Sequence, residues 1–325
     1  MRKHLMLLAV AGILFLGPLL IKNSFSLHLM IMIFYHATLS CAWNIIGGYA
    51  GQTSLGHAAY FGLGAYTIAL LEVKLGVSPW VGLVVACLLS PLVALAISYP
   101  CFRLRGPFFT LSSIAFAEVL RLIAISWRSL TNGAVGLLIP FSPGFVNLMF
   151  RGKVPYYYMS LILMFMVIAV SILIERTRLG YYLVAIKENE DAAQALGINT
   201  TKCKLIAMGT SALFTTLGGI FYAQYILFIE PDSVFAMTLS TQMALMAIIG
   251  GLGSVSGPVI GAFLLTPLNE FLRSWLGGHA AGLHAAIYGI LLIVVVLLLP
   301  EGITPWLRRA KLLRPIFHQP VSKRG

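Results

Sequence analysis

Two residues of opposite charge lie inside one long apolar segment of the sequence. Glu118 and Arg121 are three residues apart within 107–125, a spacing that places both side chains on one face of a helix. Counted from the inner end of the segment at about 1.5 Å per residue, Glu118 lies near the middle of a membrane. Charges at that depth are costly and indicate a function by default. The sequence leaves two interpretations open: a structural ion pair against a neighbouring helix, or the lining of a solute path.

A first glycine-rich turn, at 50–55, carries further polar groups. Gln52 and Ser54 lie in it, and His57 follows at the start of the next apolar segment. These groups could contact a solute, or they could cap the helix. A lone histidine in such a place is more often a hydrogen-bonded packing residue than a proton carrier, and we favour packing for His57.

A second glycine-rich turn lies at 250–257 and holds Gly253 and Ser256. Gly253, Gly257 and Gly261 form two consecutive small-xxx-small steps, which let helix backbones approach closely. Irregular backbone at membrane depth is tolerated only where it is buried in protein or lines a cavity. We favour tight helix packing over a direct ligand role, and either glycine-rich turn could be re-entrant.

The run 175–204 is the one long polar stretch of the chain. It contains five basic and four acidic residues, and its helix-forming composition followed by Gly197 predicts a helix that stops at this glycine. We expect a membrane protein to use such a helix to contact a soluble partner, here one that delivers mechanical work. The alternative is a solvated amphipathic loop helix.

The sequence lacks the motifs of the common catalytic sites. A G-x-x-x-x-G-K-[ST] phosphate loop, an H-E-x-x-H pair and a G-x-S-x-G turn are all missing, and the seven histidines are scattered. The four cysteines (Cys41, Cys87, Cys101, Cys203) have no metal-ligand spacing. The net charge of +12 sits at the ends of apolar segments and not in a basic stripe interleaved with aromatics. We therefore expect no enzyme, no metal site and no nucleic-acid partner.

Composition and segment lengths predict an all-α polytopic membrane protein. Of its 325 residues 59% are hydrophobic and 10% charged, and the mean hydropathy is +0.92, whereas soluble domains carry about 25% charged residues. A helical span needs about 20 residues. The apolar segments are 5–21, 28–49, 55–73, 80–100, 107–125, 156–174, 205–228, 237–252, 257–273 and 283–299. About ten transmembrane helices, in contact with membrane lipid, therefore make residues 1–325 a single transmembrane domain.

The basic residues predict how the spans are oriented. Fifteen of the 22 Lys and Arg residues fall on the side of both expected termini and six on the other, with Arg121 inside the membrane, which is the positive-inside pattern. The N-terminus, the loop 175–204 and the tail 301–325 are thus expected in the cytoplasm. The longest outer loop, 127–155, is either a docking surface for a soluble partner or a cap over the spans.

Five stretches, in order over nearly the whole chain, resemble a known family. They are GGYAGQTSLGHAAYFGLGAY (47–66), RLRGPFFTLSSIAFAEVLRL (103–122), WRSLTNGAVGL (127–137), AIKENEDAAQALGINTTKCKL (185–205) and GGLGSVSGPVIGA (250–262). On these motifs the chain resembles the permease subunits of branched-chain amino acid ABC importers, most closely the LivM type.

The resemblance implies roles for individual residues. ABC permeases carry a cytoplasmic E-A-A-x-x-x-G loop that seats in a groove of the ATPase subunit, and 191–197 fits it with Asp in place of Glu, although the Leu-Pro that follows in the general motif is replaced by Ala-Met-Gly at 207–209. The residues expected to couple to the ATPase are Glu188, Glu190, Asp191, Ala192, Ala193, Leu196 and Gly197. Independently of the resemblance, the charged pair and the two glycine-rich turns described above supply the residues expected along the translocation path, which are Gln52, Ser54, His57, Glu118, Arg121, Gly253 and Ser256.

The resemblance also implies partners and a mechanism. We expect a second related permease subunit, two ATP-binding subunits on the cytoplasmic side and a soluble solute-binding protein on the outer side of a bacterial plasma (inner) membrane. ATP and Mg would be used by the ATPase subunits, with no cofactor bound by this chain. Branched-chain or related amino acids would cross by alternating access, with the coupling helix as the lever.

Three alternatives stay open. An importer of the same family could carry urea or short amides. An ion-coupled secondary transporter would need ionisable residues within its spans, and Glu118 is the one deep acid. A membrane scaffold without solute flux would have no need of spans broken by glycine.

Overall fold

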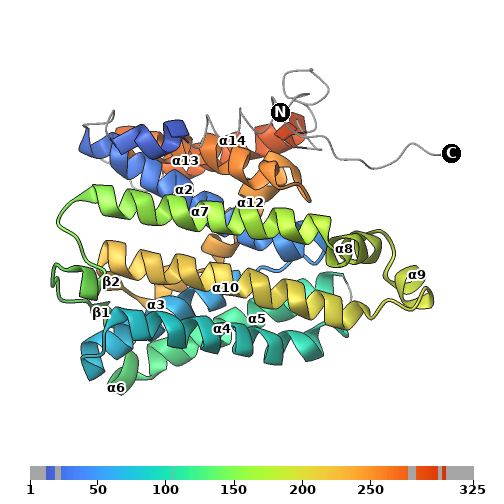
Figure 1. Cartoon of the computed structure of the whole chain (residues 1–325), viewed down its shortest axis with the longest axis horizontal. Coiled ribbons are helices and arrows are strands. Elements are labelled where there is room, and N and C mark those ends of the chain that lie inside the picture. Colours follow the sequence, from blue (N-terminus) through green and yellow to red (C-terminus); the bar gives the residue numbers. More distant parts are fainter. Residues whose placement is uncertain (1–11, 19–22, 105, 277–282, 299–301, 305–325) are drawn as a thin grey trace.

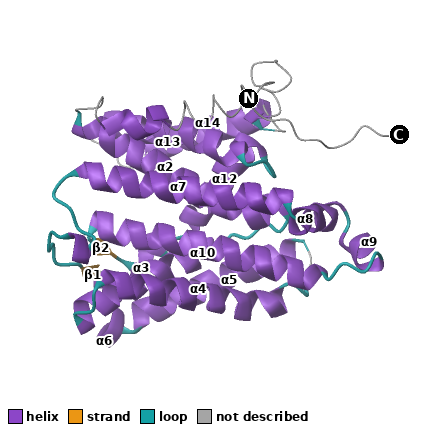
Figure 2. Cartoon of the chain, in the orientation of Figure 1, coloured by secondary structure: helices purple, strands orange, loops and turns teal. Residues whose placement is uncertain are grey.

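The computed structural model describes residues 12–18, 23–104, 106–276, 283–298 and 302–304. Most of the described chain is helical (Figure 2). The longer helices are α2 (Ser24–Asn44), α3 (His57–Leu75), α4 (Pro79–Cys101), α5 (Pro107–Ser126), α7 (Lys153–Arg176), α8 (Arg178–Glu188), α10 (Thr200–Ile226), α12 (Met237–Gly251), α13 (Ser256–Leu276) and α14 (Leu283–Leu298). The short elements are η1 (Ile45–Tyr49), α6 (Arg128–Thr131), η2 (Gly133–Val135), β1 (Leu137–Leu138), η3 (Phe145–Asn147), α9 (Glu190–Ala195), β2 (Phe228–Ile229) and α11 (Pro231–Val234).

Seven helical segments among the described residues are long and apolar enough to cross a membrane. They are Ser24–Tyr49, His57–Leu75, Pro79–Cys101, Pro107–Ser126, Lys153–Arg176, Thr200–Ile226 and Pro231–Gly251, and each coincides with a predicted span. Helices α13 and α14 also lie where spans were predicted but are not among the seven. Of the first predicted span, 5–21, the structure describes only the helical residues 12–18. The all-α polytopic class is confirmed, whereas the count of ten is not.

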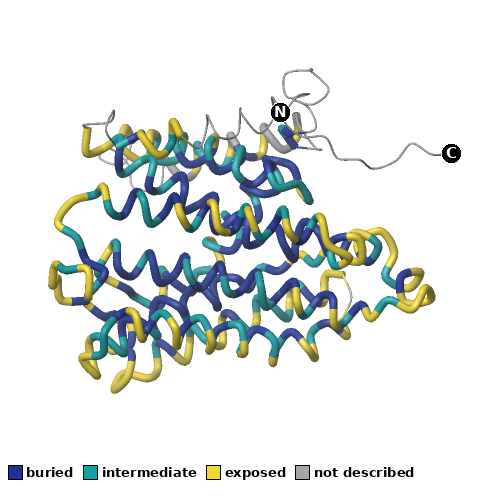
Figure 3. Tube along the Cα trace, viewed as in Figure 1, coloured by how far each residue is buried: buried dark blue, intermediate teal, exposed yellow. Residues whose placement is uncertain are grey.

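The long helices run roughly side by side along the long axis of the view in Figure 1, with β1, β2 and α6 at one end and α8 and α9 at the other. Helix α10 packs against α2, α3 and α4, while α2 also packs against α7 and α13. Large side chains such as Phe34, Trp43 and Phe61 are buried between these helices, and Figure 3 shows the buried residues along the inside of the bundle. The face of helix α4 that points away from the bundle is apolar and exposed (Val81, Val84, Val85, Leu88, Leu92). A face of this kind suits lipid tails.

The predicted outer loop, 127–155, is folded against the bundle. Strand β1 pairs antiparallel with β2, with Leu137 opposite Ile229, and Leu137, Ile139 and Met149 are buried. The loop therefore packs as a cap over this end of the helices. It also leaves large apolar side chains exposed (Val135, Leu138, Phe141, Phe145, Val146), so docking of a soluble partner on it stays a prediction.

Close packing at the second glycine-rich turn is confirmed for the glycines of α13. A Cβ on Gly261 would lie 1.9 Å from the carbonyl oxygen of Met246, and a Cβ on Gly257 would lie 2.1 Å from that of Gly251. Only glycine permits α12 and α13 to approach this closely. Gly253 belongs to the turn itself, where its φ of +72° is in the left-handed region that favours glycine.

Candidate functional site

The central polar run forms two helices, so the prediction of one continuous helix is wrong. Asn189 ends α8 in an extended conformation, and its side chain accepts a hydrogen bond of 3.0 Å from the amide of Ala192. This is an N-cap, which starts α9 in a new direction. Gly197 has a φ of +84°, which confirms the predicted stop, because the left-handed conformation ends a helix at little cost only with glycine. The run's last residues, from Thr200 on, belong to α10.

Helix α9 lies at one end of the molecule (Figure 1), and most of its residues are exposed. Ala192 and Leu196, four residues apart, are exposed, and Leu196 retains 82% of its accessible surface. Ala193 is only 2% exposed and belongs to the same buried cluster as Cys203 and Ala207 of α10. Ala192 and Leu196 are therefore placed to meet a partner, whereas Ala193 faces this chain's own core.

A buried ion pair holds α9 against α10. The Lys204 ammonium donates to Glu190 Oε1 over 2.6 Å, and Lys204 is 1% exposed. The same ammonium lies 5.1 Å from the centre of the Phe102 ring, at the end of α4, a cation–π geometry. Glu190, predicted for the ATPase contact, therefore points into the molecule.

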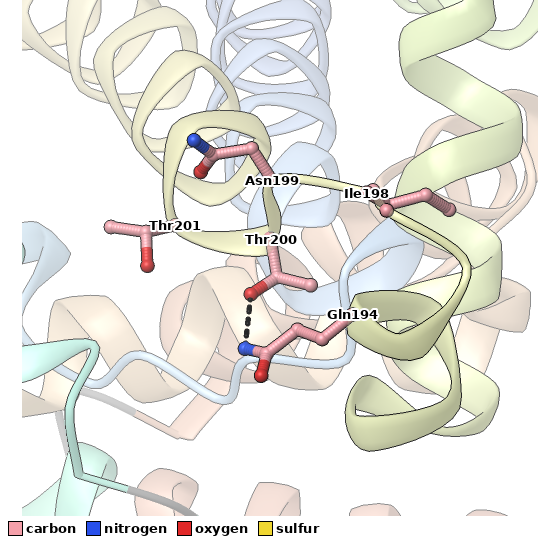
Figure 4. A pocket seen from close by; sticks show the side chains of 6 residues that line it. Gln194, Ile198, Asn199, Thr200 and Thr201 are labelled. Carbon is pink, nitrogen blue, oxygen red and sulfur yellow. Dashed lines mark hydrogen bonds between the residues drawn. The ribbon is translucent and has the colours of Figure 1, made fainter.

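A shallow hollow separates α9 from the start of α10. Its volume is about 330 Å³, and it is lined by Gln194, Gly197, Ile198, Asn199, Thr200 and Thr201. Figure 4 shows Gln194 and Thr200 pointing toward each other, and the amide of Gln194 donates to Thr200 Oγ1 over 2.8 Å. Gly197, which lines the hollow, directly follows the exposed Leu196, so this end of the molecule offers an exposed apolar residue next to a recess.

His57 lies in a fully buried hydrogen-bond chain. Its Nδ1 is 3.0 Å from Ser54 Oγ, and its Nε2 is 2.8 Å from Ser211 Oγ, which donates its proton to the carbonyl of Ala42. Because that proton is committed, Nε2 is the donor to Ser211, and in a neutral ring Nδ1 then accepts from Ser54. His57 thus joins α3 to α10 through buried hydrogen bonds, the geometry of a packing residue. Gln52, nearby in the turn, is partly exposed.

The second glycine-rich turn contacts the end of α2 and segment η1, which lead into the first turn, a contact that the sequence did not reveal. The Asn44 side chain accepts from the amide of Gly253 over 3.0 Å and donates to the carbonyl of Ser254 over 3.1 Å. Because η1 runs from Asn44 into the first turn, with Gln52 and Ser54, that turn begins beside the second, with Gly253 and Ser256. The buried Ser256 hydroxyl has no hydrogen-bond partner among the described residues.

The predicted pair of Glu118 and Arg121 is part of a three-residue cluster. Arg121 donates to both Glu118 oxygens, over 2.9 Å from Nε and 2.6 Å from Nη2, and its Nη1 bonds to Asp232 of α11. The side chains of Arg121, Glu118 and Asp232 remain 26%, 49% and 61% exposed. No hydrogen bond between described residues joins this cluster to the glycine-rich turns. The sequence analysis did not include Asp232 in this cluster. Pro231 indicates the start of a short helix with Asp232 in its first turn, but it does not indicate the pairing with Arg121.

The proteins and the family that this chain resembles are described as permeases of transport systems. Residues 25–296 match the family described as "Branched-chain amino acid transport system / permease component". The permease protein LivM of a high-affinity branched-chain amino acid transport system in Salmonella typhimurium is 26% identical, over 94% of this chain and 76% of its own length. A probable LivM permease of Methanocaldococcus jannaschii is 22% identical over 88% of this chain and 93% of its own length. The autoinducer 2 import permease LsrC of Yersinia enterocolitica is 27% identical over 38% of this chain and 36% of its own.

No solved structure matches the chain. The family match covers most of the chain, and the LivM relatives align along nearly all of it. The membrane-spanning helices are those expected of a permease. The chain therefore belongs to the family of permease components of branched-chain amino acid transport systems, and it is a permease subunit of an ABC importer.

Proposed function

We propose that this chain and a second, related permease subunit enclose a path for branched-chain amino acids, and that two separate ATPase subunits drive it through α8 and α9. The main support for this proposal is the solvent-exposed face of α9. Leu196 is 82% exposed there, and the next residue, Gly197, lines a hollow at one end of the spans. A large apolar side chain held out in solvent on an ordered helix is typical of a protein contact. ATP and Mg are used by the ATPase subunits and no cofactor by this chain.

The path is expected along α5. Glu118 and Arg121 of α5, and Asp232 at the start of the candidate span Pro231–Gly251, are partly exposed, and charged groups in such segments avoid lipid. Their exposed side therefore faces water or the second permease subunit. Two carboxylates and one guanidinium leave this cluster with one excess negative charge, and an amino acid brings both an ammonium and a carboxylate to exchange with it. We expect the remaining path residues, in the two glycine-rich turns, to act at the cytoplasmic end.

The proposed location is a bacterial inner membrane with both termini in the cytoplasm. Residues 302–304 lie against the end of α12, since the hydroxyl of Thr304 donates to the carbonyl of Gly250. This supports a C-terminal segment on the side of α8 and α9. The rest of the predicted tail 301–325 and the N-terminus lie outside the described residues. On the opposite side, the exposed apolar residues of 127–155 are the expected contact for a soluble solute-binding protein.

The test is uptake of radiolabelled leucine by the complete transporter in membrane vesicles. Uptake should require ATP inside the compartment that holds the ATPase subunits and should persist when ionophores remove the proton and sodium gradients. Unlabelled isoleucine and valine should compete, and urea or acetamide should not. Uptake that survives ATP depletion and stops with the ionophores would establish an ion-coupled secondary transporter instead.

A further inference from the structure

We propose that Lys187 is a positioning residue that transmits the movement of α8 to the two glycine-rich turns at the ends of α2–η1 and α12. The inference rests on the proposed function, because it assumes that α8 and α9 receive the ATPase stroke. The new element is the contact through which movement of α8 would be transmitted to the membrane-spanning segments.

Lys187 lies on the last turn of α8 and reaches back to the end of η1. Its ammonium donates to the carbonyl of Gly48 over 3.1 Å. Carbonyls at the C-terminal end of a helix carry partial negative charge, which favours a cation there. Segment η1 is a π-helix, a rare form that recurs at functional sites.

Two glycines with left-handed backbone make room for this side chain. A Cβ on Gly51, where φ is +68°, would lie 2.9 Å from Lys187 Cγ, and a Cβ on Gly253, where φ is +72°, would lie 3.4 Å from Lys187 Nζ. One glycine belongs to each glycine-rich turn. The stem of Lys187 therefore packs on the first turn, and its ammonium lies beside the second.

The second turn is tied to α2, which continues through η1 into the first turn, so a displacement of η1 reaches both turns. Asn44 bridges from α2 to Gly253 and Ser254. A second link joins η1 to the end of α7, where the Tyr49 hydroxyl donates to Glu175 Oε1 over 3.1 Å. Movement of α8 relative to α7 would therefore displace η1 through Lys187, and it would displace the segment before α13 through Asn44.

The chemistry of this contact suits a device that changes state. Lys187 is exposed and Gly48 is buried, so the ammonium can exchange this single charge-assisted hydrogen bond for water, whereas the carbonyl loses its partner. The candidate path residues Gln52, Ser54, Gly253 and Ser256 lie on the two turns that it holds. Breaking the contact would free both turns from α8 while the Asn44 hydrogen bonds stay in place. The two turns could then move as one unit, as a gate at this end of the path requires.

The experiment measures leucine uptake and ATP hydrolysis in the same vesicles containing the complete transporter. Lys187→Met keeps an apolar stem against Gly51 and removes the ammonium. We expect uptake per ATP hydrolysed to fall about tenfold, as loss of one hydrogen bond to a charged group implies. ATP hydrolysis and the yield of complex should stay near wild type. Lys187→Arg, which keeps a cationic donor, should retain most of the coupling.

The matched control is Lys202→Met, since Lys202 is an exposed lysine of the same loop, and it should behave as wild type. Unchanged uptake per ATP in Lys187→Met would overturn the proposal, as would equal losses in Lys187→Met and Lys187→Arg. Loss of the ATPase subunits from Lys187→Met would also overturn it, by making Lys187 part of the partner contact. Ala192→Trp, measured in parallel, separates the two hypotheses: if it keeps ATPase subunits and full uptake, the proposed coupling face fails, whatever Lys187→Met shows.

Discussion

The buried pair of Lys204 and Glu190 offers a quantitative test of how α9 is held in place. Glu190→Gln leaves the Lys204 ammonium, which is 1% exposed, with only the Phe102 ring and a neutral amide as partners. Removing one member of a buried ion pair costs about 3–5 kcal/mol. Because the Glu190 side chain is still 20% exposed, some water reaches the site, and we expect the lower end of that range, about 3 kcal/mol.

Lys204→Met should be milder than Glu190→Gln. The carboxylate that it leaves behind is partly exposed and can turn to water, while the methionine fills apolar space beside Phe102. The double variant carries no charge at the site and should recover much of the loss. The order of severity, with Glu190→Gln the worst, therefore follows from the unequal burial of the two partners.

Hydrogen exchange of the purified chain in detergent measures this effect locally. A cost of about 3 kcal/mol corresponds to about a hundredfold rise in the open population, so backbone amides over 191–198 should lose about two orders of magnitude of protection. Amides in the middle of α10 should exchange as in wild type, and Lys202→Met serves as the control. Protection within twofold of wild type in Glu190→Gln, or a larger loss in Lys204→Met, would refute the reasoning.

Two further substitutions test the helix packing. Gly261→Ala places a methyl group 1.9 Å from the Met246 carbonyl oxygen, and thermal unfolding in detergent should show a loss of about 1–3 kcal/mol in stability. The control Gly289→Ala, with nothing within 4 Å of the new Cβ, should leave the stability unchanged. Equal effects of the two substitutions would contradict close packing at Gly261. His57→Leu leaves two buried hydroxyls without their partner and should cost about 1–3 kcal/mol of stability, while the folded fraction keeps its uptake; lost uptake at full stability would instead indicate a proton carrier.

Local patterns were enough to predict most of the framework. Continuous apolar length located the spans, and Gly197 was predicted to stop a helix because its chemistry is local. The break at Asn189 was missed although its signal is present: an asparagine before Glu190 and Asp191 is a favourable N-cap followed by acidic residues in the first turn. The helix-forming residues on both sides concealed it.

Contacts between distant segments could not be read from the sequence. Lys187 and Gly48 are 139 residues apart, and Asn44 and Gly253 are 209 apart, so their pairing depends on how whole helices pack. The same holds for Asp232, which joins the predicted ion pair only because α11 lies beside α5. The inward direction of Ala193 likewise depends on how α9 is seated against α10, and motif matching carries no information about it.

The most direct test of the account is the co-purification of ATPase subunits with this chain from detergent-solubilised native membranes. Leu196→Asp puts a charge on the exposed apolar residue of α9, and Leu75→Asp makes the same change on another exposed leucine, at the end of α3. Wild type and Leu75→Asp should bring down the ATPase subunits, and Leu196→Asp should weaken the association at least about tenfold, as loss of a contact hot spot does. Undiminished recovery with Leu196→Asp, or no ATPase with the wild-type chain, would contradict the claim that α9 couples this permease to ATP hydrolysis.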